Sequence, residues 1–213
     1  MNDVRSADVA ERRVDVIEHC LAFEGYFKIA RYRLRHSQFA GGMGPEITRE
    51  IFERGEAVAV LPYDPVLDRV ILIEQFRPGA LGVETDPWLI ETIAGIVETG
   101  EDTPDVAKRE AREEAGLALL DLLPISRYFV SPGGTTETVH LFLGRVDSSG
   151  AGGLFGLPDE GEDIKVHVLD YGEALTWLGD GRVKVATAII ALQWLALHRN
   201  EIRDQWAIAA RVS

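Results

Sequence analysis

Acidic side chains are crowded into one short stretch, GIVETGEDTPDVAKREAREEAGL, which runs from Gly95 to Leu117 and holds seven acids in 23 residues. Three of them, Glu110, Glu113 and Glu114, fall within five positions. Neighbouring carboxylates on a helix repel one another, so such crowding needs either full exposure to water or a counter-ion. The stretch therefore constrains both the local structure and the surroundings of these acids.

The pattern predicts a helix across the second half of this stretch. Thr103 is expected to supply a capping hydroxyl before Pro104, and Gly116 is a natural end. At about 100° per residue, the three glutamates share one wedge, beside a stripe of small residues: Ala107, Ala111 and Ala115. If the alanines pack inward, the carboxylates border the packed face, where a divalent cation would offset their repulsion. For the hexamer REAREE alone, the alternative is a solvated helix with pairs such as Arg109–Glu113.

Read outwards, the stretch fits the pattern G-x5-E-x7-R-E-U-x-E-E-x-G-U, where U is aliphatic, and so resembles the signature of the Nudix hydrolases. The matching positions are Gly95, Glu101, Arg109, Glu110, Ala111, Glu113, Glu114, Gly116 and Leu117. Ala111 is smaller than the residue usual at its position, which affects local packing rather than chemistry. The resemblance implies cleavage of a nucleoside diphosphate linked to another group.

The subgroup is indicated by a proline outside the signature. Pro132, 16 residues after Gly116, lies in SPGGTTE and resembles the ADP-ribose pyrophosphatases. The resemblance continues through EQFRPGA, DPWLIETIAG, GEDIKVHV and IIALQW, from about Phe23 onward. It implies hydrolysis of ADP-ribose to AMP and ribose 5-phosphate with two or three Mg²⁺ ions, or Mn²⁺ as a substitute. The alternatives are another nucleoside diphosphate sugar such as GDP-mannose, and a non-catalytic nucleotide-binding module.

The resemblance also implies roles for the residues of the acidic stretch. Glu110 and Glu114 are expected to bind metal and to take part in catalysis, and Glu113 to be a further ligand. The backbone carbonyl of Ala94 resembles another metal ligand. Arg109 is expected to orient the glutamates, whereas Glu101 is expected to pair with the helix or a nearby base.

The general base of the subgroup lies in a late loop, which here resembles GLPDEGEDI, residues 156–164. By resemblance, Glu160 is expected to accept the proton from water and Glu162 to bind metal. The two roles could be exchanged. An acidic surface loop without function is the alternative.

Substrate-binding residues are expected from several segments. Arg77 is the candidate for phosphate because a guanidinium matches the fork of phosphate oxygens. Further candidates are Arg49, acting across a dimer interface, Gly95, Glu137 for the terminal ribose, and Tyr26 or Phe27 for stacking on adenine. Each arginine could instead be an ordinary ion-pair partner, and each aromatic ring could belong to the core.

The order of elements predicts an α+β (mixed α/β) protein with the Nudix fold. We expect a mixed sheet sandwiched between helices, preceded by a small antiparallel sheet that includes strands within residues 14–34. Residues 1–55 are too few for an independent core and are expected to pack in a homodimer. Residues 56–213 are expected to form the hydrolase domain.

The charge balance bears on partners and location. The chain has 22 basic and 35 acidic residues, a formal charge of −13, which argues against nucleic acid as a partner. A lone Cys20 and the lack of a signal-peptide pattern favour the cytoplasm. The apolar run at 185–198 is too short to span a bilayer, so we expect a buried helix and no membrane partner.

Overall fold

The computed structural model of the chain describes residues 12–157, 159 and 161–212, and these divide into two units. The first unit contains the chain up to Gly55 together with Phe129–Glu137, and the second contains Glu56–Tyr128 and the chain from Thr138 onward. The later segment joins the first unit through backbone hydrogen bonds. The Phe52 amide donates to the Gly134 carbonyl at 2.8 Å, and the Thr136 amide donates to the Phe52 carbonyl at 3.0 Å.

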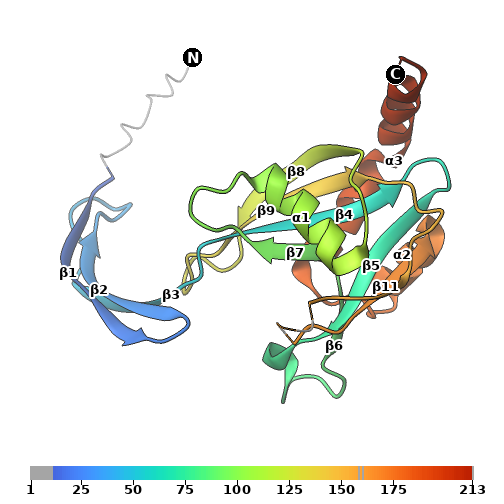
Figure 1. Cartoon of the computed structure of the whole chain (residues 1–213). Coiled ribbons are helices and arrows are strands. Elements are labelled where there is room, and N and C mark those ends of the chain that lie inside the picture. The colour runs from blue at the N-terminus through green and yellow to red at the C-terminus, as the bar shows by residue number, and fades with distance from the viewer. Residues whose placement is uncertain (1–11, 158, 160, 213) are drawn as a thin grey trace, which may run out of the picture. The chain divides into compact units, whose positions relative to one another are not determined.

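The first unit is built on one antiparallel sheet in the order β1-β2-β3 (Figure 1). Its strands are β1 (Val14–Glu24), β2 (Lys28–His36) and β3 (Ile47–Glu53). The predicted strand pair within residues 14–34 is therefore confirmed. The sheet has little core of its own, because Ala30 is fully buried whereas Val16, Phe23 and Phe39 are exposed.

The second unit is built on a mixed sheet in which β4 and β9 run parallel. The order is β10-β11-β5-β4-β9-β8, with β6 paired to β5 and β7 to β4. The strands are β4 (Glu56–Asp64), β5 (Arg69–Phe76), β6 (Trp88–Glu91), β7 (Ile93–Ile96), β8 (Asp121–Phe129), β9 (Thr138–Arg145), β10 (Gly153–Phe155) and β11 (Ile164–Asp170). A short 3₁₀ helix, η1 (Pro78–Ala80), follows β5.

Helices cover both faces of this sheet, as predicted (Figure 1). On one face, α1 (Thr103–Ala115) packs against residues such as Val58 and Val60 of β4. On the other, α2 (Tyr171–Gly179) and α3 (Ala186–Val212) pack against residues such as Ala59 and Leu61. Alternate residues of the same strand thus enter opposite cores, which is the period of a β-strand.

The start of α1 differs from the prediction. Asp102, not Thr103, is the N-cap, and no side chain caps the helix. The Asp102 carbonyl already accepts hydrogen bonds from the amides of Asp105 and Val106, so Thr103 has helical backbone and cannot act as the cap. The predicted end is confirmed: Gly116 is left-handed, with φ of 64°, and its amide donates to the Arg112 carbonyl at 3.0 Å.

The apolar C-terminal run is part of α3, but it is not buried all round. Ala188, Ala191, Leu192 and Leu195 are buried, whereas Leu197 is exposed. Apolar residues therefore face the core at helical spacing along one side. No helix in the described part of the chain is long and apolar enough to cross a membrane.

Candidate active site

The three alanines of α1 are fully buried, which confirms that this stripe packs inward. The neighbouring glutamates are consequently drawn toward the sheet. Glu114 is only 3% exposed, and its carboxylate accepts a hydrogen bond from the Ala94 amide at 3.0 Å. The Glu110 side chain is mostly buried, and that of Glu113 is half-buried. Helix α1 is therefore not a solvated acidic helix.

Burial makes the charged form of two of these acids unfavourable. It raises the pKa of Glu114 to about 8, against the lowering effect of the Ala94 amide, and the negative charge of Glu110 adds to the rise. It likewise raises the pKa of Glu110 to about 7, although Arg109 lowers this pKa. Glu162 contributes negative charge to both sites. The carboxylates thus form one electrostatic group in which the positive charges of Arg109 and Arg77 do not offset the effect of burial.

Gly95 permits the close approach of Glu110 to β7. A Cβ atom at Gly95 would lie 2.0 Å from Oε1 of Glu110 and 2.2 Å from its Cδ. Only glycine leaves room for this carboxylate over the strand. The structure therefore explains the spacing between the glycine and the glutamate by direct packing of the two residues.

Arg109 lies among three carboxylates. Its Nη1 donates to Glu110 at 2.7 Å and to Glu113 at 3.3 Å, and its Nη2 is 3.6 Å from Glu101. Glu101 also accepts a hydrogen bond from the Glu98 amide at 2.9 Å. These contacts place Arg109 where it can orient the glutamates, and the roles expected of Arg109 and Glu101 stay predictions.

Arg77 is held by an acid that the sequence analysis did not identify. Its Nε and Nη2 donate to Glu91, at distances from 2.7 to 3.2 Å, and Gln75 donates to the same carboxylate at 3.4 Å. Glu91 is 6% exposed. Burial by itself would lower the pKa of Arg77. The negative charges of Glu91, and to a smaller extent of Glu114 and Glu162, outweigh burial, so the pKa is raised. The sequence does contain a signal for this acid, because Glu91 is a charged residue inside the apolar stretch PWLIETI.

The loop that carries the predicted base is described in part. Glu160 lies outside the described residues. Glu162 accepts a hydrogen bond from the Leu157 amide at 3.3 Å, and the Gly156 amide donates to the Glu113 carbonyl of α1 at 3.4 Å. Together with the charge coupling of Glu162 to Glu110 and Glu114, these contacts bring this loop beside α1.

The remaining predicted substrate residues belong to the first unit. Tyr26 is 87% exposed, so it is not a core aromatic, whereas Phe27 packs edge-on against Phe52. Glu137 accepts hydrogen bonds from Arg54, the shorter at 3.2 Å. Arg49 is exposed, and its Nη1 donates to the Thr48 carbonyl at 2.8 Å. The roles of Tyr26, Arg49 and Glu137 stay predictions.

The three glutamates of α1 share a face, but they do not form a closed metal cage as they stand. Within the residues that the structure covers, no three acidic, histidine or cysteine side chains are gathered as a metal-binding group. Arg109 draws Glu110 and Glu113 toward itself, while Glu114 is bonded to the Ala94 amide. The site is thus a set of hard oxygen donors around a buried, negatively charged surface.

Comparison with known proteins defines the class of this chain. The NUDIX domain model matches residues 53–189, and the chain belongs to the Nudix family. An ADP-ribose pyrophosphatase of Escherichia coli (strain K12) is 46% identical over 194 residues, covering 91% of this chain and 93% of that protein. One from Haemophilus influenzae is 42% identical over 200 residues, covering 92% of each.

More distant relatives share the architecture. A GDP-mannose pyrophosphatase of Pectobacterium atrosepticum is 31% identical over 185 residues, covering 84% of this chain and 92% of that protein. A crystal structure of an ADP compounds hydrolase superposes with a TM-score of 0.65 at 20% identity, covering 86% of this chain and 95% of the other. The predicted Nudix fold is thereby confirmed.

Proposed function

We propose that this chain hydrolyses the diphosphate of ADP-ribose to AMP and ribose 5-phosphate, with Mg²⁺ as cofactor. The observation that carries the proposal is the buried carboxylate of Glu114 beside the mostly buried Glu110 on a Nudix helix, with Arg77 close enough for the charge of Glu114 to raise its pKa. This choice of substrate is supported by the similarity to ADP-ribose pyrophosphatases, which extends over at least 91% of this chain and 92% of theirs.

The donor set fits a divalent cation. Glu110, Glu113 and Glu114, with Glu162 and the carbonyl of Ala94, would hold two or three Mg²⁺ ions, or Mn²⁺ in their place. Two of these acids resist ionisation because they are buried without enough positive charge nearby, and oxygen ligands suit hard cations. When bound, the metal supplies positive charge that offsets the charge of the diphosphate and lowers the pKa of water.

The protein groups then have distinct tasks. Glu91 occupies the Nε and Nη2 edge of Arg77, which leaves Nη1 to donate to a phosphate oxygen. Arg109 holds Glu110 and Glu113 in place. Glu160 accepts the proton of the attacking water, which leaves the oxygen free to attack phosphorus as the other phosphate departs.

Recognition of the two ends of the substrate is assigned to the first unit and to β7. Tyr26 offers an exposed ring for stacking on adenine. Glu137 hydrogen-bonds the terminal ribose, Arg49 binds phosphate across a homodimer, and Gly95 lies at the substrate site, where it makes room for Glu110. We place this homodimer in the cytoplasm, with a small molecule rather than nucleic acid or a membrane as its partner.

A substrate panel tests the proposal. Purified protein is assayed with ADP-ribose, GDP-mannose and other nucleoside diphosphate sugars, each with Mg²⁺, Mn²⁺ or a chelator, and kcat/KM is compared. Glu114→Gln is the inactive control. We expect the highest kcat/KM for ADP-ribose and loss of activity with the chelator. A higher value for GDP-mannose would reassign the substrate, and turnover of none of them would indicate a nucleotide-binding module.

A further inference from the structure

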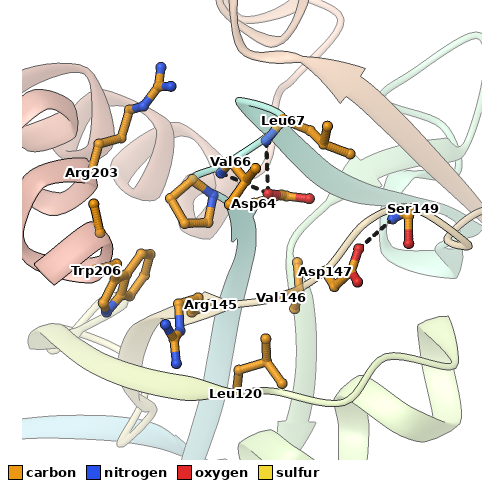
Figure 2. A pocket seen from close by; sticks show the side chains of 12 residues that line it. Asp64, Val66, Leu67, Leu120, Arg145, Val146, Asp147, Ser149, Arg203 and Trp206 are labelled. Atoms are coloured by element: carbon orange, nitrogen blue, oxygen red, sulfur yellow. Dashed lines mark hydrogen bonds between the residues drawn. The ribbon is translucent and has the colours of Figure 1, made fainter. Parts of the chain in front are cut away.

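A pocket lies in the same unit as the acidic site, where the ends of β4 and β9 and the residue before β8 meet α3 (Figure 2). Its volume is about 480 Å³, within the range of roughly 300–1,000 Å³ typical of small-molecule sites. Arg145 lines it and follows the alternate residues Leu141 and Leu143 of β9, which belong to the core on the α3 side. The pocket thus lies at the end of the sheet, where Val146 also belongs to the core on the α1 side, but none of Glu110, Glu113 and Glu114 lines it.

Most of the pocket surface is apolar. Its base includes Trp206, which is almost completely buried, and Val146. Three exposed apolar side chains stand at its edges: Val66, Leu67 and Leu120. Exposed apolar groups gathered around a concave surface favour a ligand that has an apolar body.

All but one of the charged side chains that line the pocket have partners. Asp64 accepts hydrogen bonds from the amides of Val66, Leu67 and Ser148 and from the Ser148 hydroxyl, at 2.7–3.0 Å, as Figure 2 shows in part. Asp147 accepts from the Ser149 amide at 2.9 Å, and Arg203 is 3.5 Å from Asp68.

Arg145 is the exception. Its Nε is buried and has no hydrogen-bond partner, and among the described residues its guanidinium forms no ion pair. A buried donor without a partner is unfavourable, and more so when it is charged. A chain with a formal charge of −13 has many acids that could have paired with this arginine. Arg145 instead lines a mostly apolar pocket.

We propose that this pocket binds a small monocarboxylate, with the carboxylate on Arg145 and the apolar body against Trp206, Val146 and Leu120. A carboxylate can accept two parallel hydrogen bonds from the terminal Nη1 and Nη2 groups of a guanidinium. Asp147 stands at the same pocket and repels additional negative charge, so a nucleotide or another polyanion is disfavoured. The ligand is therefore singly charged and distinct from the diphosphate substrate proposed for the α1 site.

The test uses two probes that differ in charge and little in shape, naphthalene-2-carboxylate and naphthalene-2-carboxamide. Each is titrated into the full-length protein by isothermal calorimetry, with and without saturating ADP-ribose and calcium in place of magnesium. We expect the carboxylate to bind about tenfold or more tightly than the amide, because a charge-assisted hydrogen bond is lost with the amide. ADP-ribose should leave its Kd unchanged.

Two variants and a matched control complete the test. Arg145→Met should weaken carboxylate binding to the level of the amide, and Leu120→Glu, at an exposed position, should abolish it through repulsion. Arg182→Met, whose arginine pairs with Asp180 elsewhere, should change nothing. Equal affinity for the two probes, competition by ADP-ribose, or unchanged binding to Leu120→Glu would each overturn the proposal.

Discussion

At the scale of single residues, Arg77 and Glu91 show how the site prepares a cation for phosphate. The acid is nearly buried and takes two of the donor nitrogens of the guanidinium. This contact restricts the orientation of Arg77 while Nη1 stays available. Glu91 therefore acts as a positioning residue in the proposed reaction.

Glu91→Gln tests this role. The amide retains the shape but loses the negative charge, so Arg77 is held less firmly, and we expect KM for ADP-ribose to rise about tenfold with a smaller change in kcat. Glu84→Gln is the control, because Glu84 pairs with Lys184 at a more exposed position. Equal steady-state constants for the two variants would contradict a positioning role for Glu91.

Gly95 gives a second prediction. The Cβ atom of Gly95→Ala would overlap the end of the Glu110 side chain, which can move away at little cost to the fold. We expect kcat/KM to fall at least about tenfold while the midpoint of urea unfolding is nearly unchanged. Gly172→Ala is the control, since a Cβ there meets nothing within 4 Å. An active Gly95→Ala enzyme would show that the position of Glu110 is not critical.

The two acids of the late loop are separated by a metal titration. If Glu160 is the base, Glu160→Gln should lower kcat by orders of magnitude at every Mg²⁺ concentration, because proton transfer is lost. Glu162→Gln should raise the Mg²⁺ concentration needed for half-maximal rate. If Glu160→Gln regains its activity at high Mg²⁺ and Glu162→Gln does not, the two roles are the reverse of those proposed. If neither variant is impaired, Glu137 is the next candidate for the base.

At the scale of elements, the turn between β4 and β5 depends on Asp64. This buried acid accepts four hydrogen bonds and ties the turn to Ser148 beyond β9. Burial by itself would raise the pKa of Asp64, but the donors from Ser148, Leu67 and Val66 outweigh it, and the pKa is lowered. The charged form is therefore favoured in the folded state.

The sign of the pH dependence follows from this lowered pKa. The stabilisation by Asp64 is fully present above the pKa of an unfolded aspartate, about 3.9, and is lost as pH falls through the lower folded pKa. Asp64→Asn should reduce the free energy of unfolding by about 1–3 kcal/mol at pH 7. Urea unfolding of both proteins should show this difference shrinking below about pH 4. A difference in the free energy of unfolding between the two proteins that stays constant with pH would contradict this role of the Asp64 charge.

At the scale of the whole molecule, the first unit is left with a large apolar surface. Val14, Val16, Leu21, Phe23 and Phe39 are all exposed, whereas a sheet this small has almost no core. Exposed apolar surface of this kind is typical of an interaction site. It supports the proposed homodimer, in which Arg49 acts on the partner's substrate.

Complementation between two inactive variants tests both the dimer and the role of Arg49. Arg49→Ala and Glu114→Gln are each expected to be inactive, but a mixed dimer has one site with both residues intact. After mixing and exchange of subunits, about a quarter of the wild-type activity should return, because half of the dimers are mixed and each has one complete site. Light scattering of the wild type checks the dimer, and an active monomer would refute it.

Much of the fold could be predicted because it depends on local patterns. The short apolar runs of the first strands, the acidic helix with its alanine stripe, and the glycine that ends it each show their physical reason within a few residues. The N-cap of α1 could not be assigned correctly, because Asp102 and Thr103 are equally suitable by residue type. Only the backbone conformation, with the Asp102 carbonyl already accepting hydrogen bonds, distinguishes them.

The sequence by itself determined the family, the acidic helix and the candidate ligands, since these depend on residue types at fixed spacing. The tertiary structure decided what depends on contacts between distant segments. It showed that Glu91 holds Arg77, that Gly95 makes room for Glu110, and that residues 129–137 join the first unit. It also left the Nε of Arg145 without a partner beside a pocket formed by β4, β9, α3 and the loops around them. Whether a side chain is buried, and which side chain it contacts, depends on how distant segments pack together. The spacing of residues along the chain does not specify either.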